Sequence, residues 1–226
     1  MTTITKTKSG YIEQLTFEIN SKKYYIEVKS YFVRKCYEKT ECNIGAIIEH
    51  YRSLIDDNDQ EAAEEYWNNQ NECLEKFLNT VNYPFEKFCP DYIQIFYPDN
   101  EHRKSYLKKF KEKLLKNEIS NSKDYSKNFF KKDGALSVVK SDNKNEVEFK
   151  FEKPSNISKI DNLLIIDDTI STCTTINHFL LELHQNNLLS KNTKIKIIIL
   201  YNNFKDISVV KLEDDFNLNE FMNENA

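Results

Sequence analysis

The chain has 226 residues and a nearly balanced charge, with 32 Lys and Arg against 36 Asp and Glu. This length supports one hydrophobic core with peripheral additions. The net charge of −4 gives no electrostatic footprint for nucleic acid, and no apolar run approaches the ~18 residues that span a membrane. The first residues lack the apolar core of a secretion signal, so we expect a cytoplasmic protein. The five widely spaced cysteines indicate neither a disulfide framework nor a zinc site.

The N-terminal part combines a hairpin with helices. Alternating apolar residues predict a β-hairpin within residues 11–35. A helical pattern follows over residues 44–81, with a polar break at 56–60, and Pro84 closes this region. We expect the aromatic stripe of these helices to pack in the core rather than bind a ligand.

The middle of the chain predicts two strands separated by a helix and a polar segment. Residues 91–98 indicate a strand that a proline stops, and residues 102–115 indicate a helix. Residues 117–145 are polar and rich in lysine, which is typical of a solvated loop. Residues 146–152 alternate as a strand does.

The most informative segment is residues 163–175. Four aliphatic residues, 163–166, predict a strand buried on both faces of a parallel sheet, and Asp167 and Asp168 follow where that strand should end. Small hydroxyl residues then precede a helical pattern that begins at Ile176, so free amides and the positive end of a helix dipole meet there. A ligand that fits both halves presents vicinal hydroxyls to the carboxylates and a phosphate to the turn, as a ribose 5-phosphate does.

A βαβ unit over residues 163–201 surrounds this segment, because a second strongly apolar strand follows the helix at 194–201. The acidic, Asn-rich tail from residue 213 onward is expected to fray.

Other interpretations of the acidic pair stay open or are excluded. A P-loop NTPase and a dinucleotide-binding turn both need glycine-rich loops, and the chain has only Gly10, Gly45 and Gly134. A plain alternative is that Asp167 and Asp168 form a turn and the hydroxyls a helix cap, with no ligand.

Residues 163–175 resemble the phosphoribosyl-pyrophosphate (PRPP) signature of type I phosphoribosyltransferases, in which an apolar strand, paired acids and a Ser/Thr-rich turn follow in this order. One position departs from the family pattern, because Cys173 stands where the turn usually has glycine. The backbone is therefore less free to adopt a positive φ there.

The resemblance implies a site. Asp167 and Asp168 would be the catalytic acids and hold the ribose hydroxyls, and the 5′ phosphate would lie on the turn. The implied PRPP-binding residues are Asp167, Asp168, Thr169, Ile170, Ser171, Thr172, Cys173, Thr174 and Thr175. A pyrophosphate loop would include Asp99, Arg103 and Lys104, and Phe204 would stack on the base. Mg²⁺ would be held through substrate oxygens and water, with no direct protein ligand, and the lysine-rich segment 117–145 would close over PRPP.

The expected fold is α/β, with a mostly parallel central sheet flanked by helices, type I phosphoribosyltransferase-like, and with an N-terminal hairpin and helical addition. The expected parts are an N-terminal region (1–84), a core (85–205) and a C-terminal extension (206–226) that is either a hood over the base or a frayed tail. The expected function is transfer of phosphoribosyl to a base or amine with release of pyrophosphate. A catalytically degenerate PRPP- or nucleotide-binding regulatory module and a purely structural interaction domain are the alternatives. Expected partners are PRPP or a nucleotide, without nucleic acid or membrane, and a homo-oligomer is compatible with the sequence.

Overall fold

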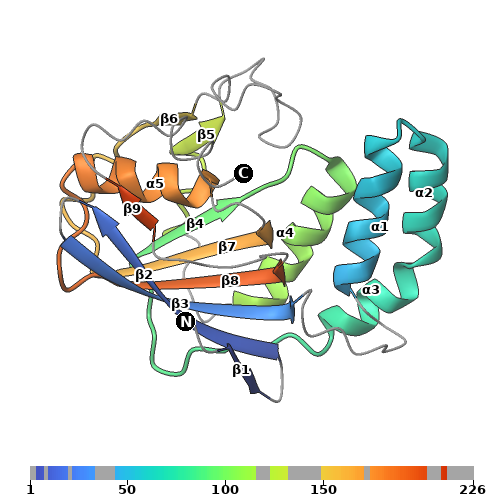
Figure 1. The fold of residues 1–226 in the computed structure, drawn as a ribbon, viewed down its shortest axis with the longest axis horizontal. Coiled ribbons are helices and arrows are strands. Elements are labelled where there is room, and N and C mark those ends of the chain that lie inside the picture. The colour runs from blue at the N-terminus through green and yellow to red at the C-terminus, as the bar shows by residue number, and fades with distance from the viewer. Residues whose placement is uncertain are drawn as a thin grey trace.

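A computed structural model describes residues 4–7, 10–19, 22–33, 44–115, 123–131, 149–170, 174–202 and 210–212. Its strands are β1 (Ile4–Thr7), β2 (Gly10–Ile19), β3 (Lys22–Val33), β4 (Tyr92–Phe96), β5 (Phe129–Lys131), β6 (Phe149–Phe151), β7 (Asn162–Ile170), β8 (Lys194–Asn202) and β9 (Val210–Leu212). Its helices are α1 (Ile44–Asp56), α2 (Gln60–Asn69), α3 (Asn71–Leu78), α4 (Glu101–Leu115) and α5 (Thr174–Gln185), all labelled in Figure 1 where there is room.

The centre of the molecule is a seven-stranded sheet in the order β1-β2-β3-β8-β7-β4, with β9 paired to β2. Strands β3, β8, β7 and β4 run parallel, and the described pairings of β2 with β1 and β3 in this sheet are antiparallel. Leu163 lies between Ile195 of β8 and Tyr92 of β4. The described residues thus confirm the expected α/β class, a mostly parallel sheet with flanking helices.

The N-terminal hairpin forms as predicted and extends this sheet. β2 and β3 are antiparallel, with Leu15 opposite Ile26. β3 also pairs in parallel with β8, so that Ile26 lies opposite Ile195. The hairpin and the expected core segment 85–205 therefore contribute strands to the same sheet.

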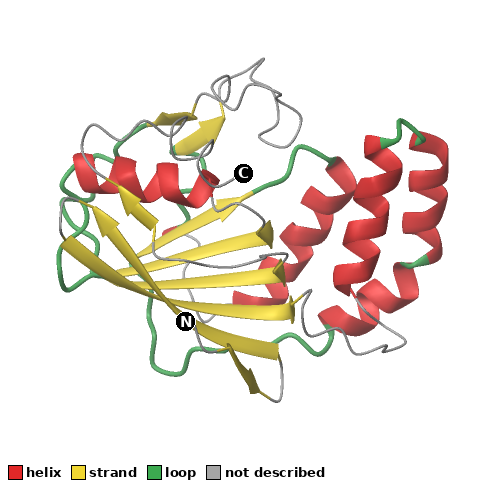
Figure 2. Cartoon of the chain, in the orientation of Figure 1, coloured by secondary structure: helices red, strands yellow, loops and turns green. Residues whose placement is uncertain are grey.

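Helices cover the sheet in layers, as Figure 2 shows with helices and strands in separate colours. One face packs against α5, where Ile165, Ile197 and Phe179 belong to one buried cluster. The other face packs against α1, α3 and α4, where Ile166 and Ile198 belong to a second cluster. In Figure 1 the arrowheads of β3, β7 and β8 point toward α1, so α1 to α3 stand beyond the carboxyl ends of the parallel strands.

The strand predicted at 146–152 is present as β6, but it does not join the central sheet. It pairs with β5 in a separate two-stranded sheet, with Phe129 opposite Phe151. The reason is apolar packing, because Phe129 and Phe151 have ring contacts with Phe179 of α5, at centroid distances of 5.1 and 6.4 Å. Most of the lysine-rich segment 117–145 and the tail beyond residue 212 lie outside the described residues.

Of the two cysteines in the described ranges, Cys73 on α3 is disulfide-bonded, whereas Cys89 is free and exposed. The sequence did not indicate the bond at Cys73, because disulfide pairing depends on distances in the fold rather than on spacing along the chain. None of the described helices is both long and apolar enough to cross a membrane.

Candidate functional site

The acidic pair lies inside β7 rather than after its end, which corrects the expectation from the sequence. β7 continues to Ile170 because β8 is equally long and pairs with it up to Asn202. β4 stops earlier, and its last residue, Phe96, lies opposite Asp167. Asp168 therefore follows the end of one neighbouring strand while the other neighbour still holds the backbone in place.

The two carboxylates point to opposite faces of the sheet. Side chains alternate along a strand, so Asp167 continues the α5 side, with Ile165, and Asp168 the α4 side, with Ile166. Asp167 is 9% exposed and Asp168 is 3% exposed. Such burial is rare for acids unless they are paired or functional.

Asp168 forms an ion pair with Arg103 of α4. The Arg103 Nε donates to Asp168 Oδ2 at 2.7 Å, and Nη2 lies 2.6 Å from the same oxygen. Arg103 is positioned by the start of α4, where Asn100 Oδ1 accepts the backbone N–H groups of His102 and Arg103 at 3.1 and 3.2 Å. This is the N-cap arrangement, and it fixes the first helical turn against the end of β7. The predicted residue Arg103 is thus brought to the acidic pair.

The surroundings of the Asp167 carboxyl disfavour its negative charge. Burial raises the pKa of its carboxyl well above the ordinary value, and the neighbouring Asp168 raises it further. The Asp168 N–H, which donates to Asp167 Oδ1 at 2.8 Å, and the positive charge of Arg103 oppose this rise in pKa. Because burial outweighs these contacts, Asp167 retains a proton at a higher pH than an exposed aspartate does.

This raised pKa predicts that Asp167→Asn stabilises the protein at neutral to alkaline pH. The folded state binds the Asp167 proton more tightly than the unfolded state, so stability is fully present below the unfolded pKa, about 4, and falls as pH rises through the raised folded value. Asparagine removes that loss, with about 2–4 °C in Tm expected for each 1 kcal/mol gained. Thermal unfolding from pH 4 to 8 measures the difference. A gain that is equal at all pH values would contradict the burial of an ionisable Asp167.

Arg52 of α1 is the site residue that sequence reasoning missed. Burial lowers the pKa of its guanidinium, and the nearby positive charge of Arg103 lowers it further, while Asp168 and Asp167 act in the opposite direction. Arg52 therefore lies in the same electrostatic neighbourhood as the acidic pair. No signal in the sequence identifies it, because residues 44–81 read as a packing helix and Arg52 is more than a hundred positions from the acids.

The remaining predicted residues fall into several groups. Ile170 is buried and Thr169 Oγ1 has no hydrogen-bond partner within the described parts of the chain. Lys104 pairs with exposed Glu101 at 2.8 Å on α4 rather than with the acids, and Asp99 is exposed in the loop before that helix. Four predicted residues lie outside the described ones, namely Ser171, Thr172, Cys173 and Phe204.

Of the segment where the 5′ phosphate is expected to bind, the structure describes the first turn of α5. Thr174 begins this helix and is buried, and Thr175 is partly buried. β7 ends at Ile170, so the helix N-terminus follows the acidic strand after a short connection. The positive end of its dipole favours an anion, and its position after a parallel strand places it at the carboxyl edge of the sheet.

The described residues do not form a metal cage. No group of three or more His, Cys, Asp or Glu side chains within the described ranges could hold a metal ion. Of the two site carboxylates, one is already bonded to Arg103 and the other favours its proton. A divalent cation at this edge would need most of its oxygen ligands from a substrate and water, as Mg²⁺ commonly takes them.

No family model matches the chain, and no curated protein matches it at a significant level of similarity.

Proposed function

We propose that this protein binds a ribose 5-phosphate ligand, PRPP or a nucleoside 5′-monophosphate, at the carboxyl edge of the sheet. We further propose that it transfers the phosphoribosyl group to a base or amine, which is the reaction that the resemblance to type I phosphoribosyltransferases implies. The observation that carries the proposal is the pair of buried aspartates in β7, followed at once by the N-terminus of α5. Buried acids with a strongly perturbed pKa, such as Asp167, are typical of functional sites.

In this proposal the chain positions the ligand and supplies electrostatic stabilisation. Asp167 and Asp168 form hydrogen bonds with the ribose hydroxyls, and the Asp168 carboxylate favours positive charge that develops at the anomeric carbon. The first turn of α5 and the segment before it bind the 5′ phosphate. Mg²⁺, when bound with the substrate, neutralises phosphate charge. No side chain needs to act as a nucleophile, because orientation and charge complementarity lower the barrier.

The ion pair with Arg103 is compatible with hydroxyl binding. Arg103 contacts only Oδ2 of Asp168, and no group among the described residues bonds to Oδ1. A carboxylate has about four lone-pair sites, so Oδ1 is left for a ribose hydroxyl.

The alternative is a binding module that has lost turnover. It is favoured by Cys173, which replaces the glycine of the family's phosphate turn. Phosphate binding through backbone amides needs close approach of the main chain, which a side chain at that position hinders. Release of pyrophosphate from PRPP with any base as acceptor would reject this alternative.

The test is calorimetric titration with ribose 5-phosphate and nucleoside 5′-monophosphates, with and without Mg²⁺, at pH 8. Asp168→Asn removes a charge-assisted hydrogen bond of about 1.5–3 kcal/mol, so the affinity should fall about tenfold or more. Asp167→Asn changes a carboxyl that favours its proton, so it should weaken binding less, by about 0.5–1.5 kcal/mol. Asp161→Asn is the matched control, because this exposed residue precedes the opposite end of β7. If both site variants bind as tightly as the parent, the ribose assignment is wrong.

A further inference from the structure

Strand β9 brings the chain to the edge of the sheet that is formed by the amino ends of the parallel strands. It pairs in parallel with β2, and Leu212 lies opposite Ile19. Ile19 in turn lies opposite Lys22, the first residue of β3, which runs parallel to β8. Figure 1 shows β9 at the end of the sheet away from α1 to α3. The residues that follow Leu212 therefore start at the amino edge, opposite to the candidate site.

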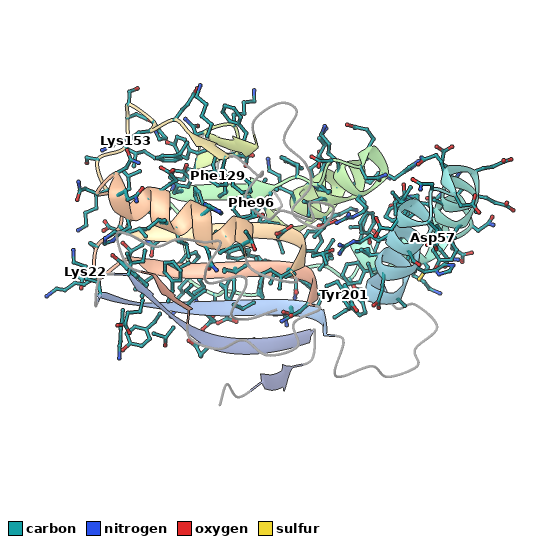
Figure 3. The ribbon with its side chains drawn as sticks, turned by 45° about the horizontal axis from the view of Figure 1, so that its top comes forward. Lys22, Asp57, Phe96, Phe129, Lys153 and Tyr201 are labelled. Atoms are coloured by element: carbon teal, nitrogen blue, oxygen red, sulfur yellow. The ribbon has the colours of Figure 1, made fainter. Side chains whose placement is uncertain are left out.

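A group of exposed lysines lies at this amino edge. Lys22 and Lys23 begin β3, Lys194 begins β8, and Lys191 precedes it by three positions. Within the described ranges, none of these four side chains has an ion pair or a hydrogen bond. Figure 3 labels Lys22 at the end of the sheet opposite to Tyr201. We refer to Lys22, Lys23, Lys191 and Lys194 as the amino-edge lysines.

Nearby acids neutralise only part of this positive charge. Glu18 of β2 lies opposite one of the amino-edge lysines and is partly buried. Asp161, just before β7, has its carboxylate 3.5 Å from Lys159. Glu27 of β3 is bonded to Lys196 at 2.5 Å. Two of these three acids therefore already have a lysine partner, and the edge keeps an excess of positive charge.

Tyr25 adds an exposed aromatic ring to the same surface, because its side chain is 69% exposed. Side chains alternate along a strand, so Tyr25 lies on the same face of β3 as Lys23. The pairing of Ile26 with Ile195 places Tyr25 beside Lys194 of β8. Exposed tyrosines are frequent anchors of interfaces. This surface therefore suits a segment that combines acidic and apolar side chains.

The sequence after Leu212 has this composition. Residues 213–226 contain five acidic residues, two phenylalanines and no lysine or arginine. The acids are Glu213, Asp214, Asp215, Glu220 and Glu224. Leu212 is two strand spacings from Lys22, roughly 10 Å. The first three acids directly follow Leu212, so they are within reach of the amino-edge lysines and have the complementary charge.

We propose that the acidic segment 213–226 binds the amino-edge lysines and Tyr25 of its own chain, and thereby holds β9 on the edge of β2. Each exposed ion pair is weak by itself, but several pairs and the Tyr25 ring act together. The contact keeps residues 17–19 of β2 paired, whereas a strand edge without a partner promotes pairing between molecules. Neither the segment nor these lysines belong to the proposed ribose site, so the contact is independent of that ligand.

Carbodiimide cross-linking of the full chain tests the contact directly, because it joins a lysine amine to a carboxylate that touches it, with loss of water. Links from residues 213–226 to the amino-edge lysines are expected, and they should become rare at 1 M salt, where the Debye length is about 3 Å. Lys108 and Lys127, which are also exposed, are the internal controls. An absence of links to the amino-edge lysines, or equally frequent links to the two controls, would overturn the proposal. Links that join only two copies, seen by mixing chains with light and heavy nitrogen, would also overturn it and assign the surface to a second copy.

Hydrogen exchange of the backbone amides in the β2–β9 pairing tests the consequence. Lys22→Glu with Lys23→Glu turns attraction into repulsion, so these amides should exchange about tenfold faster. Adding Glu213→Lys, Asp214→Lys and Asp215→Lys brings opposite charges together again and should restore slow exchange.

The matched control is Lys108→Glu with Lys127→Glu, which changes the net charge equally and should leave exchange at β9 unchanged. Exchange in β7 shows whether a variant is still folded. If the amino-edge lysine variant does not fold, neutralising the acids at 213–215 (Glu→Gln and Asp→Asn) gives the result, again as faster exchange at β9. Exchange that stays slow in the folded variants, or that the exchange of charges does not restore, would overturn the contact.

Discussion

Replacing Arg103 with methionine should destabilise the protein by about 3 kcal/mol, because Asp168 is then left as a buried charge without a partner. The two side chains are only 16% and 5% exposed, so water cannot replace the guanidinium. The alkyl part of arginine is preserved in methionine, and the change therefore tests charge rather than packing. Urea unfolding at pH 7 measures the loss.

A double-mutant cycle measures the interaction energy between Arg103 and Asp168. Adding Asp168→Asn to Arg103→Met should recover much of the stability, since no buried charge is then unpaired. Lys109→Met is the control, because its ion pair with Glu75 at 2.6 Å joins half-exposed side chains, and such pairs are worth about 0–1 kcal/mol. Equal losses for Arg103→Met and Lys109→Met would contradict a buried pair at the site.

Replacing Phe179 with alanine should cost about 3–5 kcal/mol, the range typical of a deleted core aromatic. Phe179 of α5 is fully buried, and its ring has contacts with four others on β4, β5 and β6. The centroid distances are 6.0 Å to Tyr92, 5.6 Å to Phe96, 5.1 Å to Phe129 and 6.4 Å to Phe151. Figure 3 labels Phe96 and Phe129 beside α5.

Phe179→Leu should cost less than alanine, because it leaves a smaller cavity. Phe130→Ala is the control, since Phe130 is 39% exposed on the neighbouring strand and should change stability by about 0.5 kcal/mol or less. Chemical unfolding measures all three variants. A loss for Phe179→Ala no larger than that for Phe130→Ala would mean that α5 is not anchored by this cluster, and that its first turn is not held beside β7.

The elements with strong periodic patterns were predictable. The uninterrupted aliphatic runs predicted β7 and β8, and the apolar stripe over residues 102–115 predicted α4. Strands buried on both faces and helices buried on one side each have a characteristic spacing of apolar residues, which can be recognised in the sequence. The end of β7 was predicted too early. Strand length there is decided by the partner β8, which reaches Asn202, and a partner's length is not visible in the strand's own residues.

The site was predictable only in the part that is contiguous in sequence. Asp167 and Asp168 stood out because two acids followed an apolar strand. Arg103 was found through the resemblance, and its ion pair with Asp168 joins residues 65 positions apart. Arg52 lies on a helix that looked like ordinary packing, and only the fold brings α1 to the carboxyl edge.

The pairing of β3 with β8 also constrains how the chain folds during synthesis. Glu27 of β3 and Lys196 of β8 form a contact across 169 positions. At ~5–20 residues per second, a ribosome needs roughly 10–30 s to produce the second strand after the first. During this time the edge of β3 that later pairs with β8 has no partner strand, and an unpaired edge promotes strand pairing between molecules. The charged side chains of β3, Lys22, Lys23, Glu27 and Lys29, oppose such pairing, so replacing them with apolar residues should lower the yield of native protein more than its final stability.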